Sequence, residues 1–308
     1  MKRMLTCLVV GAVLSRPSFA QETPDETSLK TVRLGAVELH YVEQGKGVAV
    51  VLVHGGLEDY RSWQPQMGGF SQRYRTIAYS RRHNYPNRPV EAGSDYSALV
   101  DAEDLAALIT TLGLAPAHVV GLSHGAYTAM LLAVRHPRLV RSLVLCEAPI
   151  LRWLPELEGG QALFSEFMSK AWEPTVRGFR ESDEAGVSAA IEGFGALGYF
   201  GTDVKVTLAA LPPEVRRVLL DNAPEWRALT ASKDAFPYVA PSAVKGIRTP
   251  VLLLSGERSL ALHGVIDRQL EKVLPRCERV VIPDATHEMW SDHPEECQNA
   301  VLAFLARH

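Results

Sequence analysis

The chain contains little cysteine and no excess of charge of either sign. Its 308 residues include 4 cysteines, and 32 Lys and Arg against 35 Asp and Glu leave a formal net charge of −3. It has no block of basic residues, which is the electrostatic pattern of a nucleic-acid-binding protein. No group of His, Cys and carboxylate residues has the spacing of metal ligands. We therefore expect neither a nucleic-acid partner nor a bound metal.

The N-terminal apolar run, residues 4–14, is shorter than the about 20 residues that span a bilayer. Lys2 and Arg3 precede this run and small residues end at Ala20, which is the pattern of a secretory signal peptide over residues 1–20. We expect cleavage after Ala20, an exported chain that is periplasmic or secreted, and no stable membrane insertion after the signal is removed.

Export would place the remaining cysteines in an oxidising compartment. Cys146 ends an apolar segment and is expected to be a buried thiol. Cys277 and Cys297 are candidates for a disulfide, but their spacing alone does not show that their Cα atoms come close enough.

What the chain does have is an alternation of apolar strand-like segments and amphipathic helix-like segments. An antiparallel hairpin is expected over residues 31–42, followed by the alternating part. This order indicates an α/β fold with a mostly parallel sheet and helices on both faces. The expected strands are 48–53, 75–79, 117–122, 139–146, 250–255 and 279–282, and the expected helices are 97–112, 126–135, 261–274 and 295–306.

The motif Gly121-Leu122-Ser123-His124-Gly125 lies between one of these strands and one of these helices. A sharp strand-to-helix turn of this kind exposes the serine hydroxyl above the end of the sheet, with the helix N-terminus beneath it. Ligands bind at the carboxyl ends of the strands in such sheets. Ser123 is therefore a candidate nucleophile.

Two further motifs follow strands. The strand at 48–53 leads into His54-Gly55-Gly56-Leu57, and the strand at 279–282 leads into a segment that contains His287. Here the chain resembles the α/β-hydrolase superfamily over about residues 31 to 306. The resemblance implies a core formed by residues 21–149 and 246–308. It also implies a helical cap over residues 150–245, inserted after the sixth strand. That segment is interrupted by prolines and rich in aromatic residues, as expected of an apolar lid.

The same resemblance assigns roles to single residues. Ser123 is the nucleophile, and His287 is the base that removes its proton. The backbone N–H groups of His124 and Gly56 are the expected oxyanion hole, with Leu57 as an alternative to Gly56. His54 is expected to hold this loop in place.

The carboxylate that should orient His287, the third member of the expected triad, departs from the common pattern of the superfamily. Many superfamily members carry an aspartate at the position that Ser259 occupies here, and a serine cannot stabilise an imidazolium by charge. Glu147 directly follows the strand at 139–146, which should neighbour the nucleophile strand, and it is the preferred acid. Glu257 and Asp284 remain open as alternatives.

Such a site predicts a serine hydrolase that acts on a small or medium, largely uncharged carboxylic ester or lactone, without a cofactor. A nucleophilic serine argues against dehalogenase and epoxide hydrolase chemistry, which uses an aspartate at this position. A perhydrolase, haloperoxidase-like or carbon–carbon bond hydrolase is an alternative. The serine at position 259 also leaves a ligand-binding protein on the same fold open. Asp104 and the run Arg81-Arg82-His83 are expected to be structural or surface features.

Overall fold

A computed structural model describes residues 29–88, 95–200 and 206–308, and the predicted signal peptide lies outside these ranges. Within them the chain forms an eight-stranded sheet in the order β1-β2-β4-β3-β5-β6-β7-β8. The strands are β1 (Lys30–Leu34), β2 (Val37–Gln44), β3 (Ala49–Val53), β4 (Arg75–Tyr79), β5 (Ala117–Leu122), β6 (Val140–Cys146), β7 (Val251–Gly256) and β8 (Cys277–Ile282).

The sheet is mostly parallel. The hairpin β1–β2 joins β4 in antiparallel fashion, whereas every pair from β4 to β8 is parallel. The central strand β3 is buried along its whole length, as its unbroken apolar sequence predicts. Its carboxyl end therefore lies beside those of β5 and β4, and the predicted fold class is confirmed.

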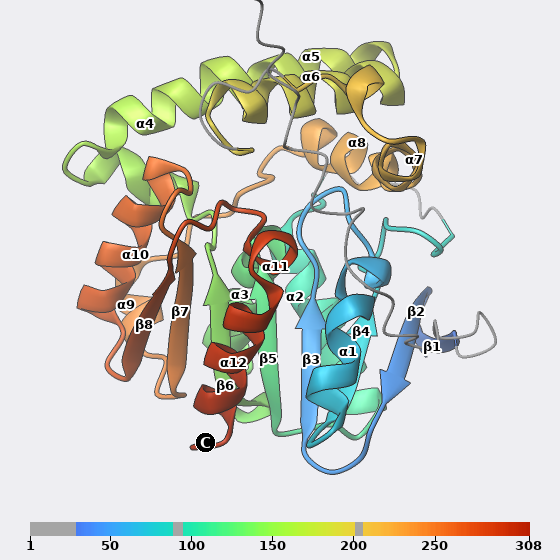
Figure 1. The fold of residues 1–308 in the computed structure, drawn as a ribbon, viewed down its shortest axis with the longest axis vertical. Helices are drawn as coiled ribbons and strands as arrows, with labels where there is room; N and C mark the ends of the chain where they lie inside the picture. The colour runs from blue at the N-terminus through green and yellow to red at the C-terminus, as the bar shows by residue number, and fades with distance from the viewer. Residues whose placement is uncertain (1–28, 89–94, 201–205) are drawn as a thin grey trace, which may run out of the picture.

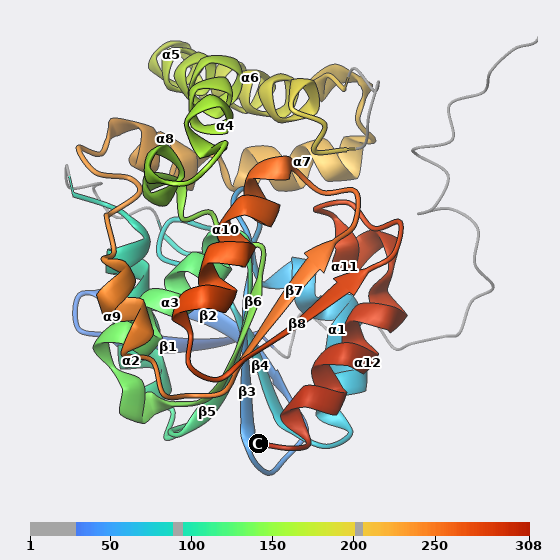
Figure 2. The same ribbon diagram turned by 90° about the vertical axis from the view of Figure 1, so that its left-hand side faces the viewer.

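Helices cover both faces of the sheet (Figures 1 and 2). One face carries α1 (Gln64–Ser71) and α12 (Pro294–Leu305), with the short α11 (Met289–Asp292) beside them. The other carries α2 (Ala98–Thr111), α3 (His124–Arg135), α9 (Pro241–Lys245) and α10 (Ala261–Val273). Each face has its own apolar core, so the sheet is buried on both sides. Two single turns complete this part, η3 (Tyr60–Trp63) and η4 (Pro137–Leu139).

The chain between β6 and α9 forms a layer of helices across the carboxyl ends of the parallel strands (Figure 1). We call the helices from η5 to α8 the cap. They are η5 (Leu151–Glu156), α4 (Gly160–Phe167), the π-helical turn η6 (Met168–Trp172), α5 (Glu173–Glu181), α6 (Asp183–Ala196), η7 (Leu208–Ala210), α7 (Pro213–Asp221) and α8 (Ala223–Ala231).

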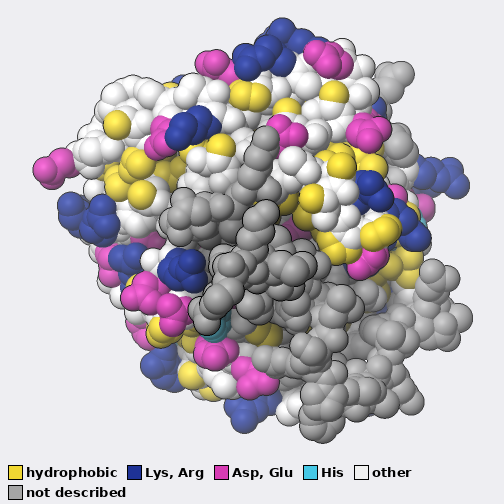
Figure 3. All heavy atoms as spheres, turned by 45° about the horizontal axis from the view of Figure 1, so that its top comes forward, with side chains coloured by type: hydrophobic (Ala, Val, Ile, Leu, Met, Phe, Trp, Pro, Cys, Tyr) yellow, Lys and Arg dark blue, Asp and Glu magenta, His cyan; other side chains and the backbone are white. Residues whose placement is uncertain are grey.

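The aromatic residues of this segment divide into two groups. Trp153 is fully buried and donates from Nε1 to the carbonyl oxygen of Val239 at 2.7 Å, so it belongs to the core. Phe194, Tyr199 and Trp226 instead line a cavity beneath the cap. On the cap face, basic and acidic side chains are interspersed with small apolar patches (Figure 3). None of the helices in the described ranges has the length and apolar character needed to cross a membrane.

Cys277 and Cys297, whose pairing the sequence leaves open, do not form a disulfide. Both thiols are free, as is the buried thiol of Cys146. Cys277 begins the edge strand β8, and its Sγ lies 3.7 Å from the carbonyl oxygen of Glu278. Cys297 lies in α12, and its Sγ is 3.4 Å from the carbonyl oxygen of Met289. The two side chains thus belong to different packing environments.

Candidate active site

Ser123 occupies the turn between β5 and α3 in a backbone conformation that is rare for a residue with a side chain, with φ 52° and ψ −120°. The turn is tight enough to require small neighbours. A Cβ on Gly121 would come within 2.4 Å of the carbonyl oxygen of Gly125, and one on Gly125 within 2.3 Å of that of Val53. The two glycines of the motif therefore allow the turn that presents Ser123 to the cavity.

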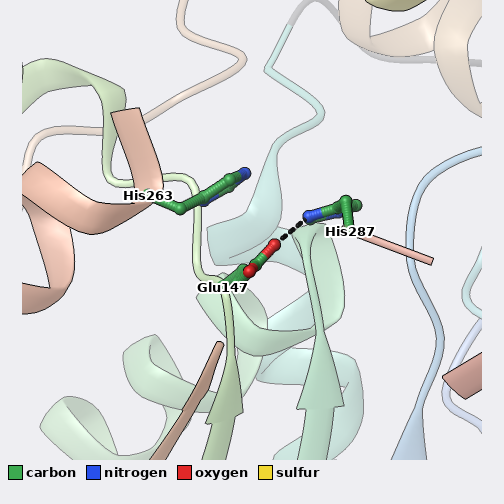
Figure 4. A group of neighbouring side chains, drawn as sticks. All are labelled: Glu147, His263 and His287. Atoms are coloured by element: carbon green, nitrogen blue, oxygen red, sulfur yellow. Dashed lines mark hydrogen bonds and ion pairs between the residues drawn. The ribbon is translucent and has the colours of Figure 1, made fainter. Parts of the chain in front are cut away.

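His287 lies in the loop between β8 and α11 and is almost completely buried. Its Nδ1 forms a hydrogen bond with Oε2 of Glu147, which directly follows β6 (Figure 4). Its Nε2 is buried and has no hydrogen-bond partner among the described residues. A histidine held through Nδ1 in this way keeps Nε2 available for a proton from a neighbouring hydroxyl.

Glu147 is fully buried and is held in place by three groups. Its Oε1 accepts a hydrogen bond from the backbone N–H of Gly256 at 2.8 Å, and its Oε2 accepts one from the Ser259 hydroxyl at 2.6 Å as well as contacting His287. Ser259, at the position where an aspartate is common, is therefore a hydrogen-bond donor to the acid.

The two alternative acids lie elsewhere. Glu257 is exposed and its Oε2 accepts a hydrogen bond from the backbone N–H of Asp284 at 3.0 Å. Asp284 itself is exposed and turns the loop with φ 56°. Neither carboxylate forms a hydrogen bond with His287, whose Nδ1 is bonded to Glu147 instead.

The Glu147–His287 pair favours a charged imidazole next to a charged carboxylate. Burial raises the pKa of Glu147, but its two imidazole neighbours and the Ser259 hydroxyl outweigh this effect and lower the pKa below its ordinary value. Burial lowers the pKa of His287, but the hydrogen bond and the charge of Glu147 outweigh it, so this pKa is raised. The acid therefore stays ionised and the histidine readily accepts a proton.

His263 of α10 completes this cluster, and no sequence motif pointed to it. Its ring stacks on that of His287 at 4.8 Å between centroids, and burial lowers its pKa to about 3, so it is neutral at neutral pH. Glu147, His263 and His287 bring potential ligand atoms within 4.8 Å of one another, and no other such group occurs in the described ranges. Glu147 and Nδ1 of His287 are already bonded to each other, which is the arrangement of an acid–base pair rather than of free metal ligands.

The candidate oxyanion hole lies between the loop after β3 and the start of α3. His124 is the first residue of α3, so its backbone N–H has no partner within the helix. The N–H of Leu57 is occupied, because it donates to Oε2 of Glu225 at 2.9 Å. The N–H of Gly56 has no hydrogen-bond partner in the described part of the chain. His54 holds this loop, accepting at Nε2 from the N–H of Arg81 at 3.0 Å.

Arg81, expected to be structural or at the surface, is structural and completely buried. Its Nη1 lies 2.9 Å from Oδ2 of Asp101 and 2.6 Å from Oε1 of Glu225, and all three side chains are 0% exposed. Asp101 also lies 3.2 Å from Nε2 of His124. Glu225 belongs to α8, so this ion pair ties the cap to the loops beside the candidate site. Arg82 pairs with Asp104 at 2.7 Å at the edge of the same region.

Beneath the cap, Ser123 borders a cavity with two lobes. Gly56, Ser123, Phe194, Tyr199 and Trp226 line both lobes. The larger lobe has a volume of about 290 Å³, and the smaller one, of about 60 Å³, also contacts His287. Further apolar residues of the larger lobe are Leu57, Ala190, Ile191, Phe200, Leu211, Val215 and Leu219.

The larger lobe contains two carboxylates that belong to none of the sequence motifs, although each is close to one. Glu58 follows the Gly55-Gly56 loop, and Glu288 follows His287 directly. Burial and the negative charge of Glu288 raise the pKa of Glu58 to about 7. Burial also raises the pKa of Glu288, although His287 and a hydrogen bond with Tyr199 act against it. This end of the lobe therefore favours neutral or hydrogen-bond-donating groups over anions.

Comparison with known proteins agrees with this geometry. A family model described as the alpha/beta hydrolase family matches residues 50–300. A 2-(acetamidomethylene)succinate hydrolase of Mesorhizobium japonicum is 28% identical over 288 residues, which cover 90% of this chain and 94% of that protein. Carboxylesterase YbfK of Bacillus subtilis is 27% identical over 270 residues, covering 83% and 80%.

Among solved structures, the enol-lactonase from Burkholderia xenovorans LB400 has the same fold, with a TM-score of 0.72 at 22% identity over 90% of this chain and 100% of that one. The strained serine turn, the buried histidine–carboxylate pair and the family match together lead to one conclusion. This chain belongs to the alpha/beta hydrolase family and is a hydrolase.

Proposed function

We propose that this hydrolase cleaves neutral carboxylic esters or lactones through an acyl-enzyme on Ser123. The observation that carries the proposal is the meeting of three features at one cavity. Ser123 stands on the tight turn, His287 lines the same lobe, and Glu147 holds Nδ1 of that histidine. This is the arrangement that nucleophilic catalysis by a hydroxyl requires.

In the proposed reaction, Oγ of Ser123 attacks the substrate carbonyl carbon while Nε2 of His287 takes the hydroxyl proton. The carbonyl oxygen becomes an oxyanion, which the N–H groups of Gly56 and His124 stabilise. His287 then gives its proton to the leaving oxygen as the bond from carbon to that oxygen breaks. Water attacks the acyl-enzyme, His287 takes its proton, and the acid leaves as Ser123 regains a hydrogen.

The two lobes suggest how the substrate lies. The leaving oxygen must receive a proton from His287, which lines only the smaller lobe, so we place the alcohol part there. This lobe, at about 60 Å³ against about 290 Å³, is the more confined of the two, which suits the smaller of the two parts of the substrate. The acyl chain then occupies the apolar larger lobe. A carboxylate on that chain would lie near Glu58 and Glu288, whose raised pKa values show that their surroundings already disfavour negative charge, and this supports a neutral acyl group.

A pair of isomeric esters tests both parts of the proposal. Methyl hexanoate puts the long chain on the acyl side, and pentyl acetate puts it on the alcohol side. Acid release in a pH-stat should give a kcat/KM for methyl hexanoate that is about tenfold or more above that for pentyl acetate. S123A should lose turnover of both esters. Turnover that persists in S123A would refute the serine mechanism, whereas equal rates in the wild type would refute only the placement of the chain.

We also propose that the chain is exported after cleavage at Ala20. N-terminal sequencing of the protein isolated from its natural host tests this. A mature chain beginning at Gln21 supports export, and an intact Met1 contradicts it.

A further inference from the structure

Trp226, on cap helix α8, lines the cavity at the candidate site and has a hydrogen-bond donor without a partner among the described residues. This donor, the indole Nε1, is buried from solvent. Leaving a buried N–H unpaired costs free energy. A donor in this state is expected to gain a partner when the cavity is filled.

The indole nitrogen of Trp226 lies close to one residue of the candidate oxyanion hole. Nε1 lies against Gly56, at 2.6 Å from the place where a Cβ of that residue would stand. Gly56 supplies one of the two backbone N–H groups of the candidate oxyanion hole, and Trp226 lines both lobes together with Ser123. The indole nitrogen therefore lies beside the loop residue whose backbone N–H is expected to face the developing oxyanion.

The fold also holds the indole in place. The preceding residue, Glu225, accepts the N–H of Leu57, so two consecutive cap residues meet two consecutive residues of the loop after β3. The ring itself packs against Phe194 at 5.6 Å between centroids. A donor fixed from both sides loses little entropy when it binds a ligand, which is what preorganised stabilisation requires.

The geometry points to Trp226 as a third, cap-borne donor to the substrate oxygen that becomes the oxyanion. This inference rests on the proposed acyl transfer by Ser123. It makes the cap part of the catalytic machinery, because the oxyanion hole then contains one group from the loop after β3, one from α3 and one from α8.

Pentylboronic acid is a suitable probe, because boron takes Oγ of Ser123 as a fourth ligand and forms a tetrahedral anion that resembles the hexanoyl intermediate. The hydroxyl proton passes to His287. In a ¹H–¹⁵N spectrum the five tryptophans give indole signals, and the signal missing in W226F identifies Trp226. We expect this signal to move downfield when the boronate binds. W172F is the matched control, because Trp172 touches Trp226 without lining either lobe.

The inference also predicts a change in kcat, with little change in KM, when the indole donor is removed. W226F keeps an aromatic ring but removes the donor, so kcat for methyl hexanoate should fall about 100-fold while KM changes by less than about threefold. Boronate affinity should weaken by a similar factor, and W172F should stay within about threefold of wild type. An unmoved Trp226 signal in the bound state, or a loss confined to KM, would overturn the inference and leave the serine mechanism standing. Failure of the wild type to bind the boronate or hydrolyse the ester would overturn the proposed function and the inference with it.

Discussion

Replacement of Glu147 by glutamine tests the candidate acid, and the structure allows its effect to be worked out. Oε1 of Glu147 faces a backbone donor, the N–H of Gly256, so the glutamine oxygen must stay on that side. The amide NH2 then faces His287, whose Nδ1 has to become an acceptor. The proton moves to Nε2, and a histidine protonated there cannot take the proton of Ser123.

We therefore expect E147Q to lower kcat by about 10³- to 10⁴-fold, which corresponds to about 4 to 5.5 kcal/mol of lost transition-state stabilisation. The assay is pH-stat turnover of methyl hexanoate, with urea unfolding to confirm that the variant folds. E257Q is the matched control, because Glu257 is exposed and contacts the N–H of Asp284. Turnover of E147Q within tenfold of wild type, or an equal loss in E257Q, would refute the assignment of the acid.

Three further results are expected. The acid limb of kcat/KM should have its midpoint above pH 6.5, because the pKa of His287 is raised and only the neutral imidazole acts as a base; a midpoint at or below pH 6.5 would contradict this. The wild type should lose up to about 3 kcal/mol of stability relative to E58Q as the pH rises from 4.5 to 7. In that window folded Glu58 keeps a proton that the unfolded chain has released. Urea unfolding measures this difference, and an equal difference in the free energy of unfolding between the two proteins at pH 5 and pH 8 would refute the prediction. R81M should destabilise the protein by about 4 kcal/mol, since two buried carboxylates lose their cation. R82M, at a partly exposed pair, should cost no more than about 1 kcal/mol in the same experiment.

The pairing of Glu147 with His287 was predictable because it follows from strand order and local pattern. A strand that is apolar throughout has to lie inside the sheet, and a carboxylate at its end has to find a partner. Ser123 and His287 follow strands in the same way, so all three reach the carboxyl edge of one sheet. The serine at position 259 is the reason to look for the acid at another position, but only the structure shows that its hydroxyl donates a hydrogen bond to Glu147.

Contacts between the cap and the core were not predictable in this way. Arg81 and Glu225 are separated by many residues, and no periodicity in the sequence relates a cap helix to a loop after β4. The same limit leaves the pairing of Cys277 and Cys297 open at the level of sequence, because their spacing contains no information about the packing of α12 against the sheet. The approach of Trp226 to Gly56 depends on the placement of α8 as a whole.

A designer who wishes to exchange the lid of this hydrolase meets two unequal attachments. At its beginning the cap joins the core through apolar packing around Leu151 and Leu154, where side chains of similar volume are tolerated. At its end, α8 is attached by the buried Glu225 carboxylate. If the segment up to residue 245 is replaced, Arg81 loses its ion pair with Glu225. If the replacement stops before Asn222, α8 and Glu225 stay with the original core. The transferable lid is therefore shorter than the inserted segment.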